Sequence, residues 1–191
     1  MTVDPLVVDC NGIDIALTPF EPAHLEAMER FARSLPAHDL LFLSRDIQHP
    51  KVIAAWLGSI ASGDISSVVA LDGDRIVGTS AIVRDLLGWS AHVAEIRILV
   101  SEEMRGRGLG RVLLQHSFSQ AISNGAEKLM ARMTPDQRSA IALFEEIGFR
   151  GEAMLRDHVR DRDGKVHDLA ILSLDVGRSA AQIGALGLAD A

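Results

Sequence analysis

The chain has 191 residues, of which 48% are hydrophobic, and its formal net charge is -7 at pH 7. This length and composition are typical of one soluble globular domain with its own core. The acidic balance argues against general nucleic-acid binding, which needs a broad basic surface. The sequence start does not resemble a signal peptide, and no apolar run is long enough to cross a bilayer. We therefore expect a cytoplasmic protein without nucleic-acid or membrane partners.

The residues that usually hold metals or form disulfides are sparse. Cys10 is the single cysteine of the chain, so it cannot form an internal disulfide, and the seven histidines are scattered without ligand spacing. The sequence therefore predicts no metal site. The chain also contains no tyrosine.

Hydrophobic periodicity and turn residues predict seven strands and four helices, and the last two strands form a hairpin. In chain order, the expected strands are 13–17, 66–71, 75–85, 91–100, 127–134, 149–161 and 165–175. The expected helices are 23–34, 50–62, 109–123 and 135–147. Hairpins mixed with strand–helix–strand units predict an α/β protein with a mixed sheet and helices on its faces.

The domain boundaries follow from these elements. We expect an N-terminal arm over residues 1–12, one domain over 13–175, and a C-terminal tail over 176–191 to which we assign no function.

The stretch Arg105-Gly106-Arg107-Gly108-Leu109-Gly110 lies between an expected strand and an expected helix. Glycines let the backbone approach a ligand closely and turn its N–H groups inward. The N-terminus of the following helix adds partial positive charge, and arginines add charge-assisted hydrogen bonds. The stretch therefore predicts a binding site for a pyrophosphate.

Two other phosphate-binding designs fit this stretch poorly. A P-loop needs Gly-Lys-Ser/Thr at its end, and no lysine follows here. A dinucleotide-binding fold needs the spacing G-x-G-x-x-G in a parallel sheet, whereas Gly106, Gly108 and Gly110 are spaced G-x-G-x-G. A nucleotide-binding domain remains as a more distant alternative.

The sequence resembles the GCN5-related N-acetyltransferases. Residues 105–110 match the Arg/Gln-x-x-Gly-x-Gly/Ala signature with which that family binds the pyrophosphate of coenzyme A. Residues 139–149, SAIALFEEIGF, resemble the family's second stretch. The resemblance covers about residues 13–175 and implies the family's fold, a mostly antiparallel central sheet with helices on both faces.

The resemblance also implies how a cosubstrate, acetyl-CoA, is held. The pyrophosphate would lie on the glycine loop, and Ile98 and Val100 would pair by their backbone with the pantetheine arm. Gln137 stands where the family often has an asparagine that contacts the coenzyme, but it is equally well explained as a first-turn helix residue. The expected coenzyme-binding residues are Ile98, Val100, Arg105, Gly106, Arg107, Gly108, Leu109, Gly110, Arg111, Gln137 and Phe144.

Glu95 is the candidate general base. It lies in the middle of an apolar strand, where a carboxylate is costly unless it is paired or functional, and near the position of a catalytic glutamate in some members of the family. Arg97, two residues on, would share its face and could instead pair with it. His92 is a weaker candidate for the base.

The family usually places a tyrosine in its second stretch as the general acid, and Phe144 occupies that position here. The acid role is therefore not filled in the family's usual way, and Phe144 would pack against the coenzyme arm. A thiol of pKa about 8.5 leaves as thiolate fairly readily, which makes the loss tolerable. The rival hypothesis is a slow or inactive module that still binds coenzyme A.

The resemblance places the acceptor pocket in residues 35–49 and 155–168, whose mixed charges could bind a zwitterion or could be a solvated rim. We expect an N-acetyltransferase that moves the acetyl group of acetyl-CoA to a primary amine of a small molecule or peptide. Direct attack in a ternary complex is expected, because Cys10 lies on the N-terminal arm. A homodimer is compatible with these features.

Overall fold

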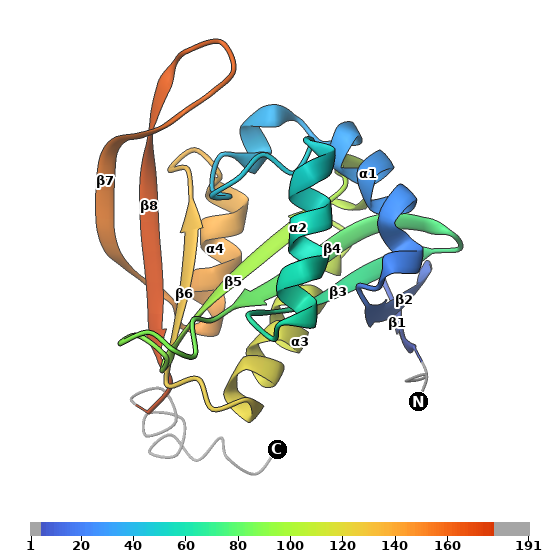
Figure 1. Ribbon diagram of the computed structural model, residues 1–191, viewed down its shortest axis with the longest axis horizontal. Helices are drawn as coiled ribbons and strands as arrows, with labels where there is room; N and C mark the ends of the chain where they lie inside the picture. The colour runs from blue at the N-terminus through green and yellow to red at the C-terminus, as the bar shows by residue number, and fades with distance from the viewer. Residues whose placement is uncertain (1–4, 178–191) are drawn as a thin grey trace.

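A computed structural model describes residues 5–177 of the protein, which form one sheet with helices on both of its faces (Figure 1). The sheet has eight strands in the spatial order β1-β2-β3-β4-β5-β6-β8-β7. Every neighbouring pair is antiparallel except β5 and β6. The strands are β1 (Leu6–Asp9), β2 (Asp14–Pro19), β3 (Ile65–Asp72), β4 (Arg75–Val83), β5 (Val93–Val100), β6 (Lys128–Met133), β7 (Arg150–Arg160) and β8 (Val166–Asp175).

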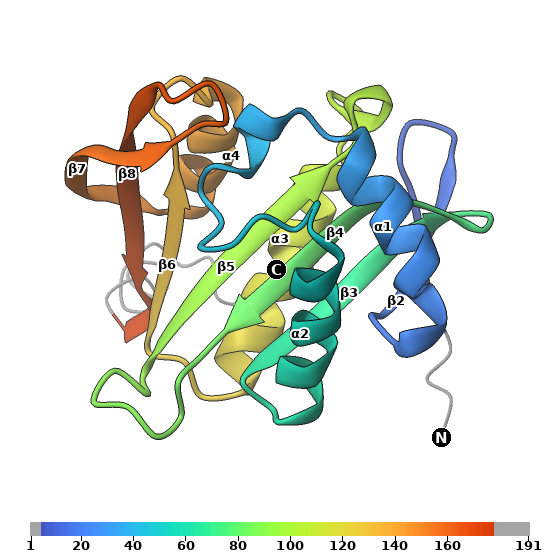
Figure 2. The same cartoon turned by 45° about the horizontal axis from the view of Figure 1, so that its top comes forward.

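The helices cover the sheet in two layers, which Figure 2 shows from above. One layer packs over β3, β4 and β5 and consists of α1 (Leu25–Ser34) and α2 (Pro50–Ala61). The other layer lies on the opposite face and consists of α3 (Leu109–Ser123) and α4 (Arg138–Ile147). Short 3-10 turns add η1 (Pro22–His24), η2 (Ala37–Leu40) and η3 (Glu102–Met104).

The predicted fold class, a mixed and mostly antiparallel sheet with helices on both faces, is confirmed. The strand β1 was not predicted, because it falls within the expected N-terminal arm. It pairs with β2 across a turn in which Asn11 and Gly12 have φ values of 55° and 82°. Four residues are too few to show a periodic pattern, so only the turn could have indicated this strand. Most of the expected C-terminal tail, residues 178–191, lies outside the described residues.

The sheet divides between its two parallel strands. β5 and β6 pair only from Val93 with Lys128 to Glu95 with Met130, after which β5 continues to Val100 and β6 turns toward β8. The two strands diverge in a V that is visible in Figures 1 and 2. A cavity of about 850 Å³ opens at this divergence and extends to the N-terminal ends of α3 and α4. We call it the main cleft.

Two phenylalanines, Phe144 and Phe149, pack against each other in the core beside the main cleft. Phe149 is fully buried, and its ring meets that of Phe144 edge to face, with 5.0 Å between the ring centroids. Both belong to the cluster that joins α3 and α4 to β5, β6 and β8. The turn after α4 therefore fixes the position of the helix that forms one wall of the cleft.

We expect Phe149→Ala to lower the free energy of unfolding by about 3–5 kcal/mol, because it removes a buried aromatic ring and leaves a cavity. Urea unfolding of the variant and the parent measures this difference. Met154→Ala on β7 is the matched control, since Met154 is 51% exposed and its loss should change the stability little. Equal effects of the two substitutions would contradict the placement of Phe149 in the core.

Candidate active site

The main cleft brings together most of the residues that the sequence predicts for coenzyme binding. It is lined by Ile98, Val100, Arg105, Gly106, Gly108, Gly110, Arg111, Gln137 and Phe144. Two further predicted residues do not line it. Leu109 is fully buried in the core beneath α3, and the Nε of Arg107 donates to the carbonyl oxygen of Glu103.

The glycine loop at the end of the cleft has the backbone of an anion-binding turn. Gly106 and Gly108 have φ values of 72° and 88°, and a Cβ at either position would meet no atom within 4 Å. The N–H groups of Arg105 and Arg107 are used within the loop, donating to Glu102 and Met104. The N–H groups of the first turn of α3 have no acceptor within the helix. The space and donors beside the two glycines fit a phosphate group.

Two arginines beside the glycine loop, Arg105 in the loop and Arg111 in α3, form ion pairs with carboxylates that also line the cleft. Arg105 forms an ion pair with Asp39 of η2 at 2.5 Å, and Arg111 pairs with Glu146 of α4. Both arginines are about half exposed, so these ion pairs are weak and screened. An incoming phosphate can therefore compete with the two carboxylates for the guanidinium groups.

Gln137 occupies the N-cap position of α4 without capping the helix by its side chain. Its Oε1 accepts a hydrogen bond from the N–H of Thr134 at 3.2 Å, which orients the side chain at the rim of the main cleft. The amide NH₂ group can still donate. Gln137 therefore serves the local turn, and its predicted contact with the coenzyme stays a prediction.

Glu95 lies at the last paired position of β5 and β6, and its side chain is 9% exposed. Arg97 donates to it through Nε at 2.9 Å and Nη2 at 3.1 Å. Arg132 of β6 donates through Nε at 3.0 Å and Nη2 at 2.8 Å. Each carboxylate oxygen thus accepts from both arginines. We call these three residues the arginine–glutamate triad, and its formal charge is +1.

The triad bears on the predicted role of Glu95. To accept a proton, its carboxylate would have to give up a charge-assisted hydrogen bond, and Glu95 lines neither of the cavities described here. The geometry favours the pairing with Arg97 that the sequence left open, and the general base stays a prediction. His92 is exposed and precedes β5, and it lines neither cavity.

A second polar group lies at the mouth of the main cleft. His38 of η2 contacts Asp136 through Nε2 at 2.7 Å, and its ring meets that of His167 with 5.1 Å between centroids. Partial desolvation would raise the pKa of Asp136, but hydrogen bonds from Thr134 and His38 outweigh it and lower the pKa. The mixed-charge segments that the sequence assigned to the acceptor side therefore meet here.

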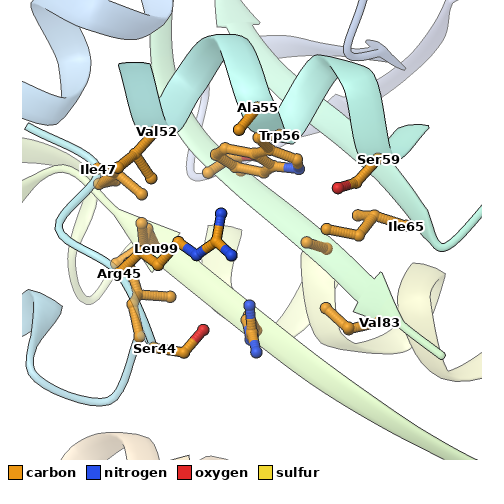
Figure 3. A pocket seen from close by; sticks show the side chains of 14 residues that line it. Ser44, Arg45, Ile47, Val52, Ala55, Trp56, Ser59, Ile65, Val83 and Leu99 are labelled. Atoms are coloured by element: carbon orange, nitrogen blue, oxygen red, sulfur yellow. The ribbon is translucent and has the colours of Figure 1, made fainter. Parts of the chain in front are cut away.

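A smaller cavity of about 250 Å³ lies between α2 and the strands β3, β4 and β5, and we call it the side pocket. Figure 3 shows Ser44 and Arg45 entering it from the loop before α2, opposite Trp56 and Ser59 of that helix. Arg97 of the triad also lines it, and Leu99 lines both this pocket and the main cleft. The two cavities therefore adjoin at β5.

A model of the acetyltransferase (GNAT) family matches residues 25–149. The protein therefore belongs to this family, as the stretches at residues 105–110 and 139–149 predicted.

The chain spans about half the length of the two curated relatives described next. The chain is 36% identical over 83 residues to YwnH of Bacillus subtilis, named as a candidate phosphinothricin acetyltransferase, covering 44% of this chain and 50% of YwnH. It is 30% identical over 79 residues to the [ribosomal protein bS18]-alanine N-acetyltransferase of Escherichia coli, covering 41% of this chain and 53% of that enzyme.

Solved structures share the fold at low sequence identity. RimJ of Mycobacterium smegmatis, in complex with CoA-disulfide, superposes with a TM-score of 0.75 at 16% identity, covering 97% of this chain and 95% of that one. A phosphinothricin acetyltransferase of Sinorhizobium meliloti, in complex with AcCoA, gives a TM-score of 0.72 at 21% identity, covering 84% and 88%.

None of the helices within residues 5–177 is long and apolar enough to cross a membrane.

We expect Gly108→Glu to abolish binding of coenzyme A, because it places a side chain and a negative charge where the phosphate would lie. Gly73→Glu in the β3–β4 turn is the matched control, since Gly73 also has a positive φ and open space around its Cβ. Both variants should lose about 1 kcal/mol of stability from backbone strain. Calorimetric titration with coenzyme A should show loss in Gly108→Glu alone; equal affinities would refute the loop as the phosphate site.

Glu95→Gln separates the two roles of Glu95. If pairing is its role, the variant leaves two arginines uncompensated, and we expect a loss of about 3 kcal/mol in the free energy of unfolding. Glu26→Gln is the control, because Glu26 is 91% exposed in a 4.0 Å ion pair. If Glu95 is instead the base, turnover should fall about 10²–10⁴-fold and recover as the pH rises. We expect the stability loss without that pH-dependent recovery.

Proposed function

We propose that the protein is an acetyl-CoA-dependent N-acetyltransferase that acts on a primary amine. The observation that carries the proposal is the main cleft itself. It begins where β5 and β6 diverge and ends at a glycine loop whose backbone fits a phosphate. A slot of this shape accommodates a long thioester whose anionic end is held at the loop.

The reaction we propose is a direct acyl transfer in a ternary complex. The amine nitrogen attacks the acetyl carbonyl, a C–N bond forms, the C–S bond breaks, and the amine proton is lost to solvent or a base. Acetyl-CoA supplies the activated acetyl group when bound. The rest of the chemistry is the positioning of the amine and the stabilisation of charge by the protein.

Cys10 supports direct transfer rather than an acylated enzyme. Its side chain is 1% exposed within the cluster between β1, β2 and α3, and it lines neither cavity. Burial, and to a lesser extent the negative charge of Asp9, raises the pKa of the Cys10 thiol. A buried neutral thiol is a poor nucleophile, so it is unsuited to carry an acetyl group.

Arg132 could take over part of the role that the family's tyrosine has toward the leaving thiolate. It lines the main cleft from β6, and its Nε and Nη2 are held by Glu95. A guanidinium fixed in this way stabilises negative charge that develops on a departing sulfur, without having to donate a proton. Phe144 then contributes packing, as its 4% exposure and its contact with Phe149 indicate.

The names of the relatives include both small-molecule and protein acceptors, so they leave the acceptor open. The other candidate is a module that binds the coenzyme without catalysis, since Phe144 stands where the family usually has the tyrosine that acts as general acid.

We expect release of free thiol from acetyl-CoA that depends on an added amine, measured with a chromogenic thiol reagent over a panel of amines and amino acids. Initial rates at varied concentrations of both substrates should give intersecting lines, and Cys10→Ser should retain the activity. Gly108→Glu is the inactive control. Coenzyme binding in calorimetry without thiol release on any amine would instead identify a binding module.

A further inference from the structure

The side pocket is cationic in an acidic protein. Two guanidinium groups line it, those of Arg45 and Arg97, and no aspartate or glutamate is among its lining residues in the described part of the chain. The net charge of the whole chain is -7. A local excess of positive charge against that background attracts small anions.

Arg45 has no partner among the residues that the structure describes. Within residues 5–177, its side chain makes neither an ion pair nor a hydrogen bond, although carboxylates pair with Arg105 and Arg111. The neighbouring Asp46 turns away and pairs with Arg162 at 2.6 Å. Arg45 is exposed and lines the side pocket, so its guanidinium group is available to a ligand there (Figure 3).

One further donor group among the lining residues lacks an acceptor in the described part of the chain, and it belongs to Arg97. Arg97 uses Nε and Nη2 for Glu95, and its Nη1 has no acceptor in the described residues. Donors that converge on one small cavity suit an oxyanion, which has only acceptors to offer.

The size of the side pocket limits its ligand. A cavity of about 250 Å³ lies below the usual range for drug-sized ligands, roughly 300–1,000 Å³. Val52, Trp56 and Leu99 give it apolar walls. It therefore accommodates a small molecule with one anionic group and a short apolar part, not a folded chain.

We infer that the side pocket binds the acid group of the acceptor, so that the acceptor is a small amine that also carries an oxyanion, such as a carboxylate or a phosphonate. This inference rests on the proposed acetyl transfer. Leu99 is common to both cavities, so a ligand anchored by Arg45 and Arg97 directs its amine toward the main cleft across β5. Apolar α-amino acids are the simplest compounds of this kind.

The experiment compares acceptors that differ only in the acid group. L-Leucine is paired with isopentylamine, and L-phenylalanine with phenethylamine; the phosphonic analogue of leucine distinguishes the two kinds of oxyanion. We expect kcat/KM to be higher for the acid-bearing member of each pair by about 10-fold or more, the effect of one charge-assisted hydrogen bond.

Arg45→Gln should lower the ratio of kcat/KM for L-leucine to that for isopentylamine by about 10-fold. Arg30→Gln on α1 is the matched control, because Arg30 is 67% exposed and lines neither cavity, and it should leave the ratio unchanged. Thermal unfolding should show both variants folded. A ratio that Arg45→Gln does not change, or a preference for the plain amines, overturns the inference while the proposed function stands.

A binding measurement keeps the inference testable without turnover. Calorimetry of the parent with L-leucine and with its phosphonic analogue should show binding that Arg45→Gln weakens and Arg30→Gln does not. If no amine releases thiol and this pattern is still seen, the proposed function fails and the anion site stands. If neither ligand binds and no acid-bearing amine is preferred, the anion site is refuted.

Discussion

The arrangement of the whole site depends on the buried contact of Glu95 with Arg97 and Arg132. Glu95 is the last residue at which β5 and β6 still pair, and Arg132 reaches back to it from the strand that is turning away. A buried carboxylate with four N–H donors is fully satisfied, and it holds two guanidinium groups in fixed directions. One of them lines the side pocket and the other the main cleft. The triad therefore joins the divergence of the sheet to the charge of both cavities.

Most of the fold could be predicted from local signals, because a few adjacent residues determine each hairpin turn and each helix end. Gly73 and Gly148 adopt the positive φ values that their turn and C-cap require, and the elements on either side follow the expected order. β1 escaped prediction because its four residues carry no period and its pairing depends on β2. The V between β5 and β6 also has no local signal, since it reflects how two strands distant in sequence pair and then separate.

The same difference between local and long-range signals decides which parts of the candidate site could be predicted. The glycine loop is contiguous, so its backbone, spacing and place between strand and helix were predictable from residues 105–110. The partner of Glu95 on β6 is 37 positions away, and that of His38 is 98 positions away, so neither contact could be read from spacing. Arg97 was visible as a neighbour on the same face, which is why pairing was already an alternative for Glu95. The ion pairs of Arg105 with Asp39 and of Arg111 with Glu146 also join residues distant in sequence, so only the structure shows them.

The charges around the side pocket connect acceptor binding with deprotonation. An amine attacks only when it is neutral, and a carboxylate in the same molecule stabilises the ammonium form and so opposes loss of the proton. In our proposal, Arg45 and Arg97 neutralise that carboxylate, and the net charge of the triad disfavours a second cation nearby. The ammonium group then loses its proton more readily, which reduces the need for a strong base. This electrostatic role fits a glutamate whose oxygens are already engaged by two arginines.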